Sequence, residues 1–279
     1  CETFQPLVDD ISAKITRKTR AVVLVSPCNP TGCVIDADTI SRIRALCAQH
    51  ALWLVVDAAY EHFVYSQEHH EHELDSSAPS YSIPFAEDGV LLLFTMSKSY
   101  ALAGWRVGFL VHPSRITPQL LKIHDANVTH ATVLSQKVAC ATLQHTPSSF
   151  LNALRALLHA NRDVLLGYLN NVVVNPNVPA PNGAFYLWVR LPRGVHEDDA
   201  IDVLARQFKV LVVPGSAFGA NAVASWDANG DVNGESAYVR VCYSGLRSVN
   251  EAHQAGKLLS DGWRELERVS RLHSCPQRQ

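Results

Sequence analysis

Three runs of consecutive apolar residues in the first third of the chain predict buried strands over residues 21–26, 52–56 and 90–94. Between the first two runs, apolar positions recur at helical spacing and predict a helix that starts near Asp36. Strand, helix and strand with unbroken apolar runs indicate a parallel sheet covered on both faces. A further run over residues 107–111 adds one more strand to this sheet.

The pattern turns helical between residues 114 and 170, where apolar positions predict one long helix over 150–169. After this helix we predict short strands alternating with two helices, with the strands over 172–174, 184–191, 210–213 and 238–243, and the helices over 197–208 and 248–271. We therefore predict a mostly parallel α/β domain over residues 1–147, followed by a connecting helix and a smaller α+β domain over 148–279.

Composition narrows the class of protein. The 279 residues are 47% hydrophobic and 18% charged, which is typical of a globular chain. A formal net charge of -2 offers no electrostatic footprint for nucleic acid or an anionic membrane, and no apolar run approaches the roughly 20 residues of a membrane helix. Seven scattered cysteines without a Cys-x-x-Cys pair predict free thiols in a reducing compartment, and we expect a cytoplasmic location. Because the sequence begins with Cys1, we also expect a processed chain or a fragment.

A lysine stands where the third predicted strand ends. Thr95 and Ser97 precede Lys98, and Arg106 follows it eight residues later. An amine can form a Schiff base with an aldehyde, while hydroxyls and a guanidinium bind phosphate. This stretch therefore suits a phosphorylated aldehyde, although by itself it fits a surface lysine and arginine equally well.

The ends of the other two parallel strands also carry polar side chains. Asn29 follows the first strand, while Asp57 and Tyr60 follow the second. Ligands of open parallel sheets bind at these strand ends. A buried carboxylate keeps a pyridine nitrogen protonated, and an amide and a phenol can hydrogen-bond a ring oxygen. Together with Lys98, these side chains predict a site for a pyridoxal ring.

Three motifs around these residues resemble those of class I aminotransferases, which are pyridoxal 5'-phosphate enzymes of fold type I. The motifs are Asn29-Pro30-Thr31-Gly32, Asp57-Ala58-Ala59-Tyr60, and Thr95-Met96-Ser97-Lys98 with Gly104-Trp105-Arg106-Val107-Gly108. The resemblance implies that Lys98 forms the Schiff base and shuttles a proton, and that Asp57 pairs with the pyridine nitrogen. It further implies that Asn29 and Tyr60 bind the ring oxygen. It assigns the phosphate to Thr95, Ser97 and Arg106.

The resemblance continues in the second half of the chain. Pro181-Asn182-Gly183-Ala184-Phe185-Tyr186 is similar to the family's entry into the small domain, and Val213-Pro214-Gly215-Ser216-Ala217-Phe218-Gly219 is similar to one of its loops. Arg240 stands where the family keeps the arginine that binds the substrate's α-carboxylate, with Asn29 as a second substrate contact. A planar guanidinium suits this task because it binds carboxylate through two parallel hydrogen bonds.

The activity implied by the resemblance is transamination of an L-amino acid with a 2-oxo acid, in the group that handles aspartate, aromatic amino acids or methionine. Two alternatives stay open: a carbon–sulfur β-lyase or decarboxylase of the same fold, and a truncated product without activity. Family members carry roughly a hundred additional residues before the Asn-Pro-x-Gly turn, including a glycine-rich phosphate-binding helix start. Residues 1–20 contain no counterpart, so we expect an incomplete large domain, and a homodimer when the protein is full length.

Several features imitate other sites. Residues 68–73 alternate glutamate and histidine but lack metal-ligand spacing, and residues 227–231 fail the calcium-loop pattern at its later positions. We therefore expect no metal site. Cys28 and Cys33 are expected to be buried thiols, and Trp105 to pack against the protein.

Overall fold

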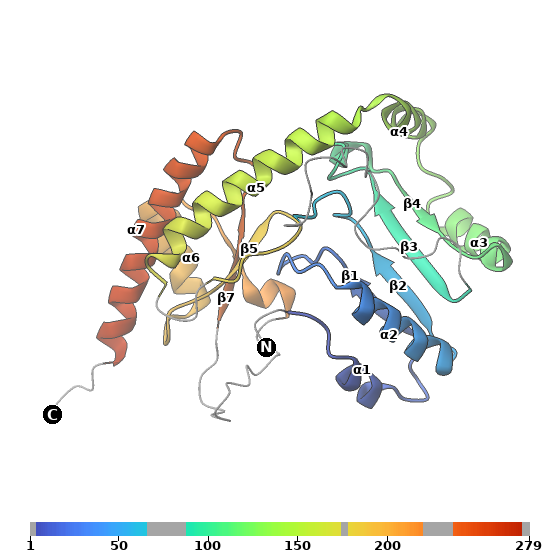
Figure 1. The fold of residues 1–279 in the computed structure, drawn as a ribbon, viewed down its shortest axis with the longest axis horizontal. Helices are drawn as coiled ribbons and strands as arrows, with labels where there is room; N and C mark the ends of the chain where they lie inside the picture. Colours follow the sequence, from blue (N-terminus) through green and yellow to red (C-terminus); the bar gives the residue numbers. More distant parts are fainter. Residues whose placement is uncertain (1–3, 66–87, 174–177, 220–236, 275–279) are drawn as a thin grey trace.

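A four-stranded sheet and a three-stranded sheet form the two halves of this computed structural model, which describes residues 4–65, 88–173, 178–219 and 237–274. The long helix α5 (Ser148–Asn170) extends from one half to the other (Figure 1). It matches the helix predicted over residues 150–169 to within two residues at each end.

The four-stranded sheet contains the four strands predicted for this part of the chain, and it is mostly parallel as predicted. Its strands are β1 (Ala21–Val25), β2 (Trp53–Asp57), β3 (Val90–Thr95) and β4 (Gly108–Val111). They lie in the order β1-β2-β3-β4, with the first three parallel and β4 antiparallel to β3. The register places Val25, Asp57 and Leu93 side by side. The ends of the three parallel strands therefore meet at one edge of the sheet.

Helix α2 (Ala37–Gln49) joins β1 to β2 and begins where the sequence predicted. The Asp36 carboxylate accepts a hydrogen bond of 2.7 Å from the backbone N–H of Thr39, and this bond lowers the pKa of Asp36. Ile40 and Ile43 of α2 join Leu54 of β2 in one hydrophobic core cluster. A short helix that the sequence analysis missed, α1 (Val8–Lys14), packs against α2.

The sheet is covered on one face within the described residues, and not on both as predicted. Leu24, Leu54 and Leu92 point to the face under α2 and are buried, whereas Val23 on the other face is 62% exposed and Leu93 is 38% exposed. Unbroken apolar runs show that strands are suited to burial on both sides, but they do not show which segment covers each side.

The segment between the two sheets is helical, as predicted. It contains the short η2 (Ser114–Ile116), followed by α3 (Thr117–Asn127) and α4 (Val133–His145). Another short helix, η1 (Ala103–Trp105), lies earlier in the chain, between β3 and β4. Leu121, Ile123 and Leu134 on α3 and α4 are exposed, so this pair of helices packs loosely against the described residues.

The second half contains the antiparallel sheet β5-β7-β6 and two helices. These elements are β5 (Tyr186–Arg190), α6 (Glu197–Phe208), β6 (Val213–Pro214), η3 (Gly215–Phe218), β7 (Tyr238–Cys242) and α7 (Val249–Ser274). Helix α7 packs against α5 and α6, and the fully buried Trp263 lies in this core. The predicted strand over 172–174 is wrong where it is described, because the N–H groups of Val172 and Val173 both bond the carbonyl of Leu169 and end α5. The strand predicted over 210–213 begins only at Val213.

The two halves are joined by a close backbone contact. The Gly183 N–H donates to the Gly32 carbonyl at 2.9 Å, and the Val34 N–H donates to the Asn182 side-chain oxygen at 2.8 Å. The hydrophobic core of the second half also takes in Tyr60 from the segment after β2. The predicted domain boundary between residues 147 and 148 stays a prediction, because this core draws residues from both sides of it.

One carboxylate is buried between the segment after β2 and the turn after β3. Glu61 is 7% exposed, one of its oxygens lies 3.4 Å from His62 Nε2, and the other has no hydrogen-bond partner among the described residues. The hydroxyl of Tyr100 lies 3.4 Å from the same His62 nitrogen. Burial raises the pKa of Glu61 to about 7 and also lowers the pKa of His62.

Replacing Gly32 by alanine should weaken the contact between the two halves. Gly32 has a φ of +69°, and an added Cβ would clash with the Cβ of Pro181 and lie 2.9 Å from the Gly183 carbonyl oxygen. We expect Gly32→Ala to lower the free energy of unfolding by about 2–4 kcal/mol in urea titrations. The matched control is Gly167→Ala in α5, where an added Cβ meets nothing within 4 Å, and which should be neutral or stabilising. Equal losses in both variants would contradict the expectation.

The buried Glu61 predicts a pH-dependent stability. Because its pKa rises from 4.5 in the unfolded chain to about 7, the folded state holds the proton more tightly, and its stability falls as the pH increases from 4.5 to 7. In the Glu61→Gln variant the glutamine side chain is uncharged at every pH. Its stability relative to the wild type should therefore rise by about 2–3 kcal/mol between pH 5 and pH 8. The same substitution at the partly exposed Glu267 is the control for urea unfolding at the two pH values.

Candidate active site

The sheet edge where the parallel strands end carries a carboxylate and two hydroxyls. One oxygen of Asp57, the last residue of β2, accepts a hydrogen bond from the Ala59 N–H at 3.1 Å. Thr95, the last residue of β3, donates from Oγ1 to Ser97 Oγ at 2.9 Å and accepts from the Ser97 N–H at 3.1 Å. The tight turn that these bonds make leads directly into Lys98.

Lys98 lies opposite the phenol ring that follows β2. Its Nζ is 5.9 Å from the centroid of the Tyr60 ring, and its side chain is half-buried. The structure therefore brings together the ends of β2 and β3 as the spacing of the motifs predicted. At this edge an amine, a phenol and a carboxylate come from two neighbouring strands.

Tyr60 is held by a second phenol that comes from the other sheet. Its hydroxyl lies 2.8 Å from the Tyr186 hydroxyl, and the two rings meet edge to face with their centroids 5.7 Å apart. Burial raises the pKa of Tyr60, and burial together with the Tyr60 bond raises the pKa of Tyr186 further. Both phenols are therefore uncharged at neutral pH.

An arginine from β7 meets the amide that follows β1. Arg240 Nη1 donates to Asn29 Oδ1 at 2.7 Å, across 211 residues of sequence. The guanidinium lies between two rings, with its Cζ 4.3 Å from the Tyr186 centroid and 4.8 Å from the Phe218 centroid. Its Nε is buried and has no hydrogen-bond partner in the described residues.

Arg106 is the predicted site residue that the structure leaves apart from the others. Its backbone is left-handed at φ 51°, its side chain is exposed, and its Nη1 donates to the Ala103 carbonyl at 2.9 Å. In the described ranges no hydrogen bond or ion pair joins its guanidinium to Thr95, Ser97 or Lys98.

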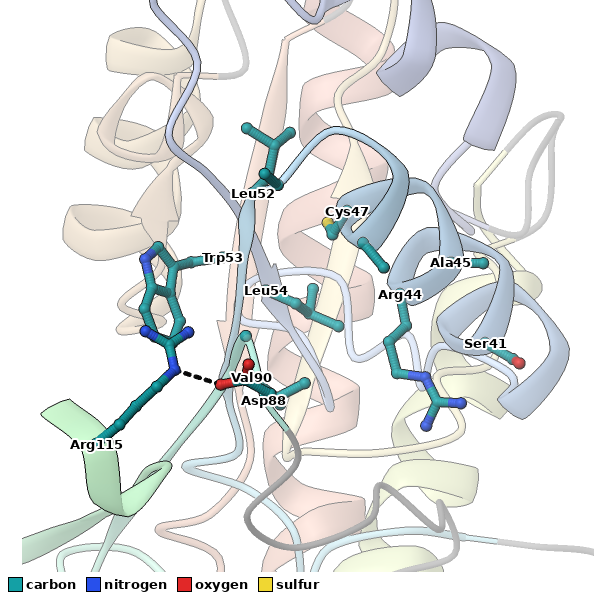
Figure 2. Close-up of a pocket in the computed structure, with 13 residues that line it drawn as sticks. Ser41, Arg44, Ala45, Cys47, Leu52, Trp53, Leu54, Asp88, Val90 and Arg115 are labelled. Carbon is teal, nitrogen blue, oxygen red and sulfur yellow. Dashed lines mark hydrogen bonds and ion pairs between the residues drawn. The ribbon is translucent and has the colours of Figure 1, made fainter.

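A separate hollow of about 740 Å³ lies at the other end of the strands (Figure 2). It is bordered by α2, the start of β2 and η2, where Arg115 pairs with Asp88 and lies 4.9 Å from the Trp53 centroid. None of the predicted site residues lines it. The chemistry that the motifs predict therefore lies at the opposite edge of the sheet from this hollow.

The expectations for the cysteines, for Trp105 and for the metal-like segments have different outcomes. Cys33 is a buried thiol, as predicted, and burial raises its pKa to about 12, whereas Cys28 is half-buried. Trp105, which was expected to pack against the protein, is 39% exposed, and no other residue of η1 is buried either. The segments over 68–73 and 227–231 lie outside the described residues, and the rest contains no cluster of three or more metal-ligating side chains. None of the described helices has the length and hydrophobicity needed to cross a membrane.

The sequence analysis assigned no role to Tyr186 or Phe218, although both stand in quoted motifs. Each contacts Arg240, and Tyr186 also contacts Tyr60. For Tyr186 the only local signal is an aromatic residue at the start of an apolar strand, and this fits a core residue equally well. Phe218 ends η3, where no such pattern marks it. Their contacts appear only when the two sheets pack together.

Comparison with known proteins shows the family. The model of "Aminotransferase class I and II" matches residues 1–255. A probable aspartate/prephenate aminotransferase of Aquifex aeolicus is 30% identical over 226 residues, which cover 78% of this chain and 55% of the relative. The aromatic aminotransferase ISS1 of Arabidopsis thaliana is 30% identical over 252 residues, covering 88% of this chain and 56% of the relative.

Solved structures agree with this similarity. The aromatic aminotransferase from Pyrococcus horikoshii superposes with a TM-score of 0.75 at 27% identity, over 98% of this chain and 65% of that one. The aspartate aminotransferase from Thermus thermophilus with maleate gives a TM-score of 0.74 at 25% identity, over 94% and 61%. The chain spans about half the length of the curated relatives it matches. Both its sequence and its fold, a fold type I arrangement, show that it belongs to the class I and II aminotransferases.

Proposed function

We propose that this chain carries the catalytic lysine and the carboxylate-binding arginine of a transaminase, which moves an amino group between an L-amino acid and a 2-oxo acid. The observation that supports this function is one arrangement of side chains. Lys98 and Tyr60 face each other at the sheet edge, and the Asn29–Arg240 pair lies on the other side of Tyr186. An amine for proton transfer and a guanidinium for carboxylate binding are what this reaction needs.

We propose pyridoxal 5'-phosphate as the cofactor, and the side chains present fit it. Asp57 supplies a carboxylate for the pyridine nitrogen, Tyr60 and Asn29 can hydrogen-bond the ring oxygen, and the Thr95 and Ser97 hydroxyls suit the phosphate. The unsatisfied Nε of Arg240 is a further donor that a bound ligand would satisfy. When bound, the cofactor withdraws electrons from the substrate's α-carbon.

The residues of the chain divide the remaining work. With the cofactor bound, Lys98 Nζ would accept the proton that leaves the substrate's α-carbon and would donate it to the cofactor. Arg240, held by Asn29 and by its two flanking rings, binds the α-carboxylate and orients the α-carbon toward Lys98. Tyr60 holds the cofactor's ring oxygen. Arg106 would add a guanidinium to the phosphate site, and one of its nitrogens is bonded to the Ala103 carbonyl.

The names of the relatives suggest the substrate class and the type of reaction. The compared proteins are named as aspartate, aspartate/prephenate and aromatic aminotransferases, so we propose an acidic or aromatic amino acid as the amino donor. These names favour transamination over the β-lyase and decarboxylase alternatives. A homodimer of the full-length protein and a cytoplasmic location stay proposals of the same kind, drawn from the resemblance and the free thiols.

Removing the lysine tests the function directly. In the full-length protein, Lys98→Ala should abolish the visible absorbance of bound pyridoxal phosphate and its covalent trapping by borohydride, and should lower transamination by about 10²–10⁴-fold. Lys122→Ala, on the exposed surface of α3, is the control and should retain all three. Trapping that persists at another lysine in the Lys98→Ala variant would contradict the proposal. A wild type that shows no band would make the chain a non-catalytic product.

Shortening the arginine fork tests the substrate contact. Arg240→Lys keeps the charge but loses the paired donors and the planar contact with the Tyr186 and Phe218 rings. We expect the KM for the amino acid to rise roughly 30-fold, since a hydrogen bond to a charged group contributes about 2 kcal/mol. Arg264→Lys on α7, whose side chain is exposed, should leave KM unchanged. An unchanged KM in Arg240→Lys would show that the carboxylate binds elsewhere.

A further inference from the structure

Tyr186 contacts both ligand-binding groups of the proposed site. It is the first residue of β5, and its side chain is 4% exposed. Its hydroxyl lies 2.8 Å from the Tyr60 hydroxyl, and the face of its ring lies 4.3 Å from Arg240 Cζ. The Tyr186 hydroxyl therefore contacts Tyr60, which is proposed to bind the cofactor. The Tyr186 ring contacts Arg240, which is proposed to bind the substrate.

The surrounding packing fixes the position of this side chain. Tyr186 pairs with Cys242 in the register of β5 and β7, and its ring contacts Phe185 at 4.9 Å and Tyr60 at 5.7 Å between centroids. All three aromatic residues belong to the core of the second half. Because the pair of hydroxyls is buried, each phenol depends on the other for a partner, and water does not readily replace it.

The direction of the hydrogen bond between the two hydroxyls decides whether Tyr60 can donate a proton to a ligand. A phenol has one proton to donate, so one member of the pair donates and the other accepts. If Tyr60 donates to Tyr186, it has no proton left for a ligand. If Tyr186 donates, Tyr60 keeps its own proton, and accepting a hydrogen bond makes it a stronger donor.

We propose that Tyr186 is a positioning residue that donates its hydroxyl proton to Tyr60 and thereby directs the Tyr60 proton to the ring oxygen of the cofactor. The proposal rests on the proposed function, since it acts through Tyr60. The ring of Tyr186 has a separate task, because its face holds the Arg240 guanidinium against Phe218. Tyr186 thus links carboxylate binding in one half of the structure to cofactor binding in the other.

The two tasks are separable by substitution. Tyr186→Phe removes the hydroxyl and keeps the ring, so it should weaken what Tyr60 does and spare what Arg240 does. In the full-length protein we expect the dissociation constant of pyridoxal phosphate to rise roughly fivefold, the size of one neutral hydrogen bond. The KM for the amino acid should stay within about twofold of the wild type. Tyr186→Leu, which also removes the ring, should raise KM as well.

A spectroscopic reading distinguishes this role from general loosening of the site. A hydrogen bond donated to the ring oxygen stabilises its anionic form. With weaker donation from Tyr60, the pH at which the absorbance of the bound cofactor changes should move upward in Tyr186→Phe. Tyr60→Phe should move it further in the same direction. The double variant should match Tyr60→Phe alone, because Tyr186 acts through Tyr60.

The matched control for Tyr186→Phe is a tyrosine elsewhere in the same sheet. Tyr238→Phe, on β7 and stacked on Trp188, is a second aromatic position of the same sheet and should change neither the dissociation constant nor the pH midpoint. Additive shifts in the double variant, or an unchanged midpoint in Tyr186→Phe, would overturn the proposal while leaving the transaminase intact. A wild type that binds no pyridoxal phosphate would overturn the function and this inference together.

Discussion

The backbone contact between Gly32 and Gly183 holds the rest of the site in place. It joins the turn after β1 to the segment that enters β5, and Asn182 adds a side-chain bond to the Val34 N–H. Buried backbone groups need partners, so each half satisfies polar groups of the other. The contact thereby joins the turn that carries Asn29 to the sheet that contains Arg240. The positive φ of Gly32 and its close approach to Pro181 explain why a residue without a side chain stands there.

The environment of Arg240 shows how the second half prepares a binding group. Two rings cover the faces of its guanidinium, and Asn29 orients one nitrogen. In the proposed function, the edge of the guanidinium is what remains for the substrate's carboxylate. Since the rings exclude water, an ion pair formed there is screened less than at an open surface. The Tyr186 ring also contacts Tyr60, so the groups proposed to bind the carboxylate and the cofactor pack against the same side chain.

The uncovered face of the large sheet lies on the same side as Asp57. Val25, Asp57 and Leu93 are neighbours in the register of parallel strands, and Leu93 is substantially exposed. Within the described residues, α2 covers the opposite face, and Val8 and Ile11 of α1 pack against the same core. The matched regions cover 55% and 56% of the two relatives. The exposed apolar face is therefore also the face on which Asp57 lies.

The sequence by itself determined the elements and the residues at the strand ends. Apolar runs and helical spacing depend on neighbouring residues, so they predicted β1 to β4, α2 and α5, and they placed Asp57, Thr95 and Lys98 at one edge. Short motifs predicted Asn29 and Arg240 as binding residues, but neither motif contains the other residue. Only the tertiary structure decided that they bond each other, that Tyr186 bonds Tyr60, that Arg106 bonds the Ala103 carbonyl and that Glu61 is buried. These contacts join residues up to 211 positions apart, and their distances follow from the packing of two sheets, which local pattern does not encode.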